Sequence, residues 1–306
     1  MVFTKKEAPP TLQGSALRYA RVRGDIIQIK RGLYVKTTNS SSIDPYTLLA
    51  HGFPAPVVSH HTALELHGYA YSHRIIHTTF TDTDQRSFQF QRNTFIAVAF
   101  PKVLREKQRT RTETIKVFRA GESLIATSLE RTLVDCLARP DLSGGLDEVK
   151  RGFELARTQI DVDRLCKYVV LLENKTLTGL VGLMLERLAI QVSTKLRGIL
   201  HRHAPKSPQY ARATPGEGTF IKNWNVVVPK SLVPQTPKLV TGRSSITFST
   251  YDAEKVRRAK AENRRAILRA SPAKKLAMQH THSIVGYNRD DFKQPLDLSR
   301  AAVGFL

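Results

Sequence analysis

At 306 residues the chain is long enough for about two domains, each with its own core. Its formal charge of +22 at pH 7 is far larger than solubility requires, so we expect a polyanionic partner, and nucleic acid fits that charge best. The sequence has no apolar run of about 18 residues, and its start, MVFTKKEAPP, lacks the apolar stretch of a signal peptide. These features argue against membrane-spanning and secreted classes and favour a cytoplasmic protein without a membrane partner.

Residues 1–37 predict a small winged helix-turn-helix head. A helix is expected over 14–22, followed by a hairpin whose strands IIQIK and LYVK meet at Arg31-Gly32. Helix followed by β-ribbon is the second half of a winged helix, in which both parts contact DNA. The candidate DNA-binding residues are Arg18, Tyr19, Arg21, Arg23, Lys30, Arg31 and Lys36.

A polar stretch over 38–44 predicts a linker, and 45–230 predicts a mixed body. Its first part should hold helices over 45–51 and 62–67, with strands around PVVSH, RIIHTTF, FIAVAF and TIKVF. Helices follow from Ser128, which is the expected N-cap, and then over 146–156, 162–172 and 177–190. One apolar strand, FIKNWNVVVP, carries Trp224 and ends the body. The fold class is therefore α+β.

The basic segment 231–306 predicts a poorly ordered tail with one helical stretch over 253–276. The only two cysteines, Cys136 and Cys166, lie within helical apolar patterns. We expect them to be buried, reduced thiols.

Histidines cluster from the end of the strand predicted around PVVSH to the strand predicted around RIIHTTF. A metal-dependent nucleic-acid enzyme is one hypothesis for them. The possible ligands are His60, His61, His67, His73, His77 and Glu65. Adjacent His60 and His61 point apart on any regular element, and Glu65 and His67 do not share a helix face. Structural histidines are the better account, so we expect no metal.

The block SLERTLVDCLARPDLSGG offers Glu130, Arg131, Asp135 and Arg139 as an acid-base set. Arg131 and Asp135 stand one helical turn apart, and Arg139 continues the row, which favours a structural ion-pair network. The sequence shows no Ser-His-Asp elbow, paired-carboxylate site or nucleotide fingerprint. We therefore expect no catalytic residue and no cofactor.

Four segments in order, RGDIIQIKRGLYVK, VVSHHTALELHG, IATSLERTLVDCLARPDLSGGLDEV and GTFIKNWNVVVP, resemble the AbiEi-type antitoxins of type IV toxin-antitoxin systems. The resemblance covers about residues 14–230. It implies an N-terminal winged helix that binds the operon's own promoter as a repressor, and a C-terminal domain that counteracts a nucleotidyltransferase-like toxin. A transcriptional regulator without a toxin partner is the alternative.

The chain departs from this family at both ends. Family members carry about two helices ahead of the one predicted over 14–22, so we expect a truncated head. The tail after residue 230 has no counterpart, and the resemblance implies nothing about its role.

Overall fold

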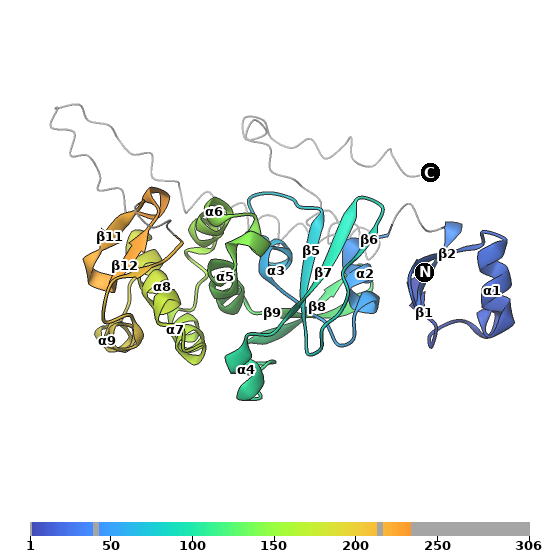
Figure 1. Cartoon of the computed structure of the whole chain (residues 1–306), viewed down its shortest axis with the longest axis horizontal. Helices are drawn as coiled ribbons and strands as arrows, with labels where there is room; N and C mark the ends of the chain where they lie inside the picture. The colour runs from blue at the N-terminus through green and yellow to red at the C-terminus, as the bar shows by residue number, and fades with distance from the viewer. Residues whose placement is uncertain (1, 39–42, 213–216, 234–306) are drawn as a thin grey trace, which may run out of the picture. The chain divides into compact units, whose positions relative to one another are not determined.

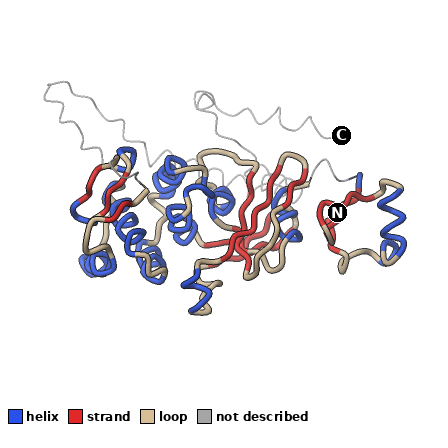
Figure 2. The backbone as a smooth tube through the Cα atoms, viewed as in Figure 1, coloured by secondary structure: helices blue, strands red, loops and turns tan. Residues whose placement is uncertain are grey.

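The structure is a computed structural model that describes residues 2–38, 43–212 and 217–233, and it has the expected α+β fold (Figures 1 and 2). Three sheets occur in these residues: a small N-terminal one, a six-stranded mixed one, and a small one near residue 220. A cluster of helices lies between the second and third sheets in the chain (Figure 1). None of the described helices combines the length and the apolar character that a membrane crossing requires.

The N-terminal head is a three-stranded antiparallel sheet with one α-helix packed on it. Its elements are β1 (Val2–Thr4), η1 (Pro10–Leu12), α1 (Ser15–Val22), β2 (Ile26–Lys30) and β3 (Leu33–Lys36), and the strand order is β1-β3-β2. The predicted helix and hairpin are confirmed. Strand β1 was not predicted, because three residues are too few to show a period of two. Ahead of α1, the described residues form β1 and the single turn η1 but no α-helix, so the head contains one α-helix of a helix-turn-helix among its described residues.

Both faces of β3 are buried, each against a different partner. Tyr34 packs with Leu17 of α1 in the core of the head. Leu33 and Val35 point the other way and share a hydrophobic cluster with Tyr46, Phe88 and their neighbours in the body. The stretch predicted as a linker therefore connects two pieces that share a core.

The six-stranded sheet carries the first half of the body. Its strand order is β6-β7-β5-β4-β9-β8, with parallel pairs β5·β7 and β4·β9 and the other neighbours antiparallel. The strands are β4 (Val57–Val58), β5 (Ile76–Thr81), β6 (Phe88–Phe90), β7 (Asn93–Ala99), β8 (Thr114–Arg119) and β9 (Glu122–Thr127). The helices of this half are α2 (Pro45–Gly52), α3 (His60–Leu66) and α4 (Lys102–Glu106). Asp44 caps α2 by accepting a hydrogen bond from the Tyr46 amide at 2.8 Å.

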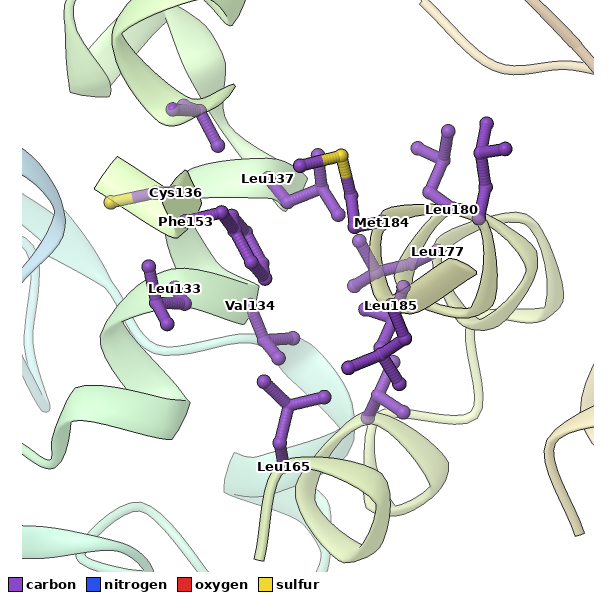
Figure 3. Packing of buried hydrophobic residues seen from close by; sticks show 14 of the residues in the cluster. Leu133, Val134, Cys136, Leu137, Phe153, Leu165, Leu177, Leu180, Met184 and Leu185 are labelled. Carbon is purple, nitrogen blue, oxygen red and sulfur yellow. The ribbon is translucent and has the colours of Figure 1, made fainter. Parts of the chain in front are cut away.

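The helical half of the body packs around α5, which begins at the N-cap Ser128 as predicted. Its elements are α5 (Leu129–Ala138), η3 (Pro140–Ser143), α6 (Leu146–Ala156), α7 (Val162–Leu171), α8 (Lys175–Arg187) and α9 (Thr194–His203). Figure 3 shows Val134 and Leu137 of α5 on the side of Leu165 and the α8 side chains Met184 and Leu185, while Leu133 lies on the other side of the helix. Every residue of α5 from Glu130 to Leu137 is buried, and α5 contacts α3, α6, α7 and α8, so it is the central helix of this core.

The last described segment corrects one prediction. FIKNWNVVVP is not a single strand: β11 (Thr219–Ile221) and β12 (Val226–Val228) pair as a hairpin around η4 (Lys222–Trp224), and β10 (Gln209–Tyr210) adds in parallel to β12. The chain reverses at Asn225, whose φ of 49° is left-handed, a conformation that Asn tolerates. The turn η5 (Lys230–Leu232) follows and buries Leu232, two residues past the predicted end of the body.

Two glycines let α8 approach this small sheet closely. A Cβ at Gly182 would lie 2.4 Å from the Trp224 ring, and one at Gly179 would lie 2.9 Å from Val226. The only tryptophan in the chain is thus held flat against α8, with His201 of α9 stacked on it at 4.2 Å. The helix predicted over 253–276 and the rest of the tail from 234 lie outside the described residues.

Candidate nucleic-acid interface

The outer face of α1 is a stripe of exposed side chains. Positions i, i+3, i+4 and i+7 of a helix share one face, and here they hold Ser15, Arg18, Tyr19 and Val22. Tyr19 is 66% and Val22 is 76% exposed. The opposite side of α1 is buried on the sheet. The candidates predicted from the sequence include Arg18 and Tyr19 but not Ser15 and Val22. The helical periodicity places all four residues on one face and is the signal that could have identified the missing two.

The predicted cations of the head divide into paired and unpaired groups. Arg23 pairs with Asp25 at 2.9 Å, and Nη1 of Arg21 donates to the Gln28 side chain at 2.6 Å. Among the described residues, three of the predicted cations are exposed and have no such partner: Arg18, Arg31 and Lys36. Lys5 and Lys6, which are not among the candidates predicted from the sequence, are likewise exposed and unpaired there. Of the predicted cations, the three without a partner are best placed to neutralise phosphate.

Lys30 does not join them, because its ammonium group lies against the body. The Nζ atom is 4.6 Å from the centre of the Phe53 ring and 4.8 Å from that of Phe88. Burial lowers the pKa of Lys30, although the side chain is not fully enclosed. The predicted wing contact is thus a cation-π contact between head and body.

The two ends of the hairpin lie far apart. Lys36 pairs with Ile26 at one end and, together with Arg23, lines a hollow of about 580 Å³ beside the last turn of α1. Arg31 sits in the turn at the other end, about 13 Å away at roughly 3.3 Å per residue. The structure therefore groups Lys36 with α1 and separates Arg31 from the end of that helix.

Three of the five candidate histidines bond to three different partners. His67 bonds the Thr127 carbonyl oxygen at 2.8 Å, His73 the Glu65 carboxylate at 3.2 Å, and His77 the Asn93 side chain at 3.0 Å. Burial lowers the pKa of His67 and His77. Among the described residues, no three metal-ligating side chains gather around one point.

His60 and His61 face different partners, as their adjacency predicts. His60 is buried with a left-handed φ of 52°, and its Nδ1 lies 2.9 Å from the Ser59 hydroxyl. Burial lowers the pKa of His60 from 6.5 to about 3. His61 lies 3.3 Å from Glu148, a carboxylate that accepts hydrogen bonds from the amides of Tyr71 and Ser72.

The predicted ion pair of the ERTLVD helix is confirmed and completely enclosed. Nε of Arg131 is 3.3 Å from Asp135, and the two side chains are 0% and 2% exposed. Nη1 of Arg131 donates to the Thr110 carbonyl at 2.9 Å, and the Tyr168 hydroxyl donates to Asp135 at 2.8 Å. The group holds α5, α7 and the loop before β8 together and leaves no open face for a substrate.

The prediction that Arg139 continues this row is wrong. Arg139 pairs instead with Asp141 at 2.7 Å, on the surface. The helix ends at Ala138 because Pro140 disfavours helical geometry at the residue before it, so Arg139 leaves the helix face.

Both cysteines are free and buried, as expected. Burial raises the pKa of Cys136 to about 12 and that of Cys166 to about 11. Neither thiol is a thiolate near neutral pH, so neither is activated as a nucleophile.

No protein-family model and no curated protein matches the chain. Among solved structures, the chain is similar to the crystal structure of the RV2827C protein from Mycobacterium tuberculosis, at 16% sequence identity and a TM-score of 0.49. The similarity covers 74% of this chain and 86% of that one. It assigns neither a ligand nor a reaction to the residues described above.

Proposed function

We propose that this chain is an AbiEi-type antitoxin that binds its own promoter as a transcriptional repressor. The observation that carries the DNA-binding half is the outer face of α1, where Arg18 stands between the exposed side chains of Ser15, Tyr19 and Val22. A helix with such a face fits the major groove of duplex DNA, where arginine bonds guanine or phosphate and apolar groups contact thymine methyls. Lys36 extends the cationic surface beyond the end of the helix.

The antitoxin half rests on the resemblance of the four segments quoted above. In this role the body carries out no reaction of its own, and the nucleotidyltransferase-like toxin supplies the chemistry. Burial supports a structural role for the most characteristic segment, since Glu130, Arg131 and Asp135 are all enclosed in the core. A surface of the body other than the ERTLVD helix is therefore expected to counteract the toxin.

The DNA-binding half is tested by the salt dependence of binding to the chain's own promoter. Each neutralised phosphate adds about 0.9 to the slope of log K against log salt. We expect Arg18→Ala to weaken binding and flatten the slope by about one unit, while Lys30→Ala leaves the slope unchanged because its ammonium group faces Phe53 and Phe88. Equal slopes for wild type and Arg18→Ala, or a flatter slope for Lys30→Ala, would contradict the assigned interface.

The antitoxin half is tested by co-expression with a neighbouring nucleotidyltransferase-like gene. Wild type and Arg18→Ala should both restore growth, because the substitution lies in the head. Growth arrest that persists with wild-type chain present, or the absence of such a neighbour, would favour the alternative of a regulator without a toxin.

A further inference from the structure

The small C-terminal sheet bears a row of side chains across its three strands on the face away from the helical core. Tyr210 of β10 pairs with Val227 of β12, which pairs in turn with Phe220 of β11. Tyr210 is 54% and Phe220 is 46% exposed. Cross-strand partners project from the same face, so the two rings flank Val227 on one surface, about 10 Å apart at roughly 4.8 Å per strand.

The opposite face of this sheet is fixed against the helical core. Val226 and Val228 are fully buried, and Trp224 closes onto the bare backbone of Gly182. Figure 1 shows β11 and β12 beside α8, which packs on this inner side. Tyr210 and Phe220 are therefore held outward on a rigid support.

The chain around this sheet is strongly basic. Residues 191–233 contain seven lysines and arginines and a single carboxylate, Glu217. Exposed lysines stand at the ends of the strands: Lys206 shortly before β10, Lys222 directly after β11, and Lys230 shortly after β12. Within the described residues, none of these three pairs with a carboxylate.

We infer that this surface, formed by Tyr210, Val227 and Phe220 with the surrounding lysines, binds single-stranded nucleic acid. Exposed aromatic rings on one face of a sheet are the means by which sheet-based RNA-binding domains stack two or three unpaired bases. Here the two rings stand on the outer strands, with Val227 of the middle strand between them. Lysines at the edge of such a platform neutralise the backbone phosphates without regard to sequence. Duplex DNA does not fit, because its bases are already stacked on one another.

A second copy of the chain fits this surface less well. A whole aromatic side chain can bury about 150 to 250 Å² of accessible surface. The two half-exposed rings together therefore offer roughly 200 Å² of surface for burial. A stable protein interface needs about 800 Å² per partner. The lysines would also repel the same lysines on a symmetric partner. Aromatic rings within a basic border favour a flat, anionic ligand.

The test measures the binding of labelled oligonucleotides to the full chain by fluorescence anisotropy. The probes are oligouridylate RNA and oligothymidylate DNA of about ten nucleotides, and a duplex of the same length. We expect Tyr210→Ala and Phe220→Ala each to weaken single-strand binding by about tenfold or more, while duplex binding stays within about twofold. If the RNA binds more tightly than the DNA, the surface is assigned to RNA. If the two bind equally, the surface is assigned to single strands of either kind.

The matched control is Phe118→Ala, because Phe118 is 73% exposed on another sheet and lies 5.3 Å from Lys116. It should bind single strands as the wild type does. Emission of Trp224, which lies beneath the surface, verifies that the sheet is intact in each variant. Single-strand affinity that survives both substitutions, or falls equally in the control, overturns the inference. Sedimentation showing that the substitutions dissociate an oligomer without changing single-strand affinity would assign the surface to a second copy instead.

Discussion

At the scale of single residues, Arg131 is a fully buried charge held on several sides. Its guanidinium group is enclosed by the rings of Phe80, Phe100 and Tyr168 at centroid distances between 5.4 and 5.6 Å. Asp135 supplies its counter-charge at 3.3 Å. A buried charge that loses its partner costs far more than an exposed one, because it has no water to replace the lost contact.

Asp135→Ala should therefore destabilise the chain by about 3 to 5 kcal/mol, since it leaves Arg131 enclosed without a carboxylate. Asp141→Ala removes the partner of Arg139 on the surface and should cost less than about 1 kcal/mol. Urea unfolding of both variants measures the difference. Similar losses of unfolding free energy in the two variants would show that Asp135 does not stabilise the buried charge of Arg131.

His60 makes stability depend on pH. Its folded pKa of about 3 lies below the ordinary value of 6.5, so below pH 6.5 the unfolded chain takes up a proton that the folded chain does not. The contribution of neutral His60 is full above pH 6.5 and is lost as the pH falls toward 3, at up to about 1.4 kcal/mol per pH unit. Burial lowers the pKa of His61, His67 and His77 as well, which adds to the loss.

Unfolding free energies measured between pH 7 and pH 5 test this dependence. His60→Asn should make them fall less steeply with acid, because Asn does not titrate and tolerates the left-handed backbone at this position. The control is His73→Asn, since that side chain is 81% exposed. An unchanged pH dependence in His60→Asn would remove His60 as its source.

At the scale of elements, α8 and the hairpin β11-β12 depend on close backbone approach. Gly182→Ala should destabilise by about 1 to 3 kcal/mol, because its Cβ would stand 2.4 Å from the Trp224 ring and displace it. Gly198→Ala on α9 is the matched control. Its Cβ meets nothing within 4 Å, so it should stabilise the helix by up to about 1 kcal/mol. Thermal unfolding distinguishes the two variants. If Gly182→Ala unfolds at the same temperature as the wild type, the hairpin can shift to accommodate the added methyl group without loss of stability.

Elements with a clear periodicity of apolar residues or a clear capping residue could be predicted from the sequence. Elements without either signal could not. The helix over Leu146–Ala156 has the predicted bounds, and Ser128 accepts a hydrogen bond from the Arg131 amide as an N-cap should. The short elements β6 and α4 are only a few residues long, and β9 shows no clean alternation of burial. In α9 only Leu200 is fully buried, which leaves too weak a stripe to recognise.

At the scale of the whole molecule, the sequence located the cations of the head but not which way each one faces. Periodicity places Arg18 on the outer face of α1. It cannot show that Lys30 meets Phe53 and Phe88, since that contact joins segments far apart in the chain. The row of Tyr210, Val227 and Phe220 cannot be predicted either, because it requires strand pairing across a turn within FIKNWNVVVP, a segment whose apolar pattern predicts one continuous strand.

The shared core predicts that the head adds to the stability of the body. A chain of residues 43–233 should unfold at lower urea concentration than one of residues 1–233, because Tyr46, Phe53 and Phe88 lose the cover of Leu33 and Val35. The fragment should also bind an apolar fluorescent dye more strongly. Equal midpoints for the two chains would show that the head adds nothing to the stability of the body.

The burial of both faces of β3 also limits how this chain can evolve. Recombination that exchanged the head alone would set Leu33 and Val35 of one lineage against α2 and β6 of another. Point substitution on the outer face of α1 carries no such constraint, since that helix lies over the face of β3 that bears Tyr34. Under the proposed DNA binding by α1, changes of ligand preference should therefore accumulate at positions 15, 18, 19 and 22, and not arise by domain shuffling.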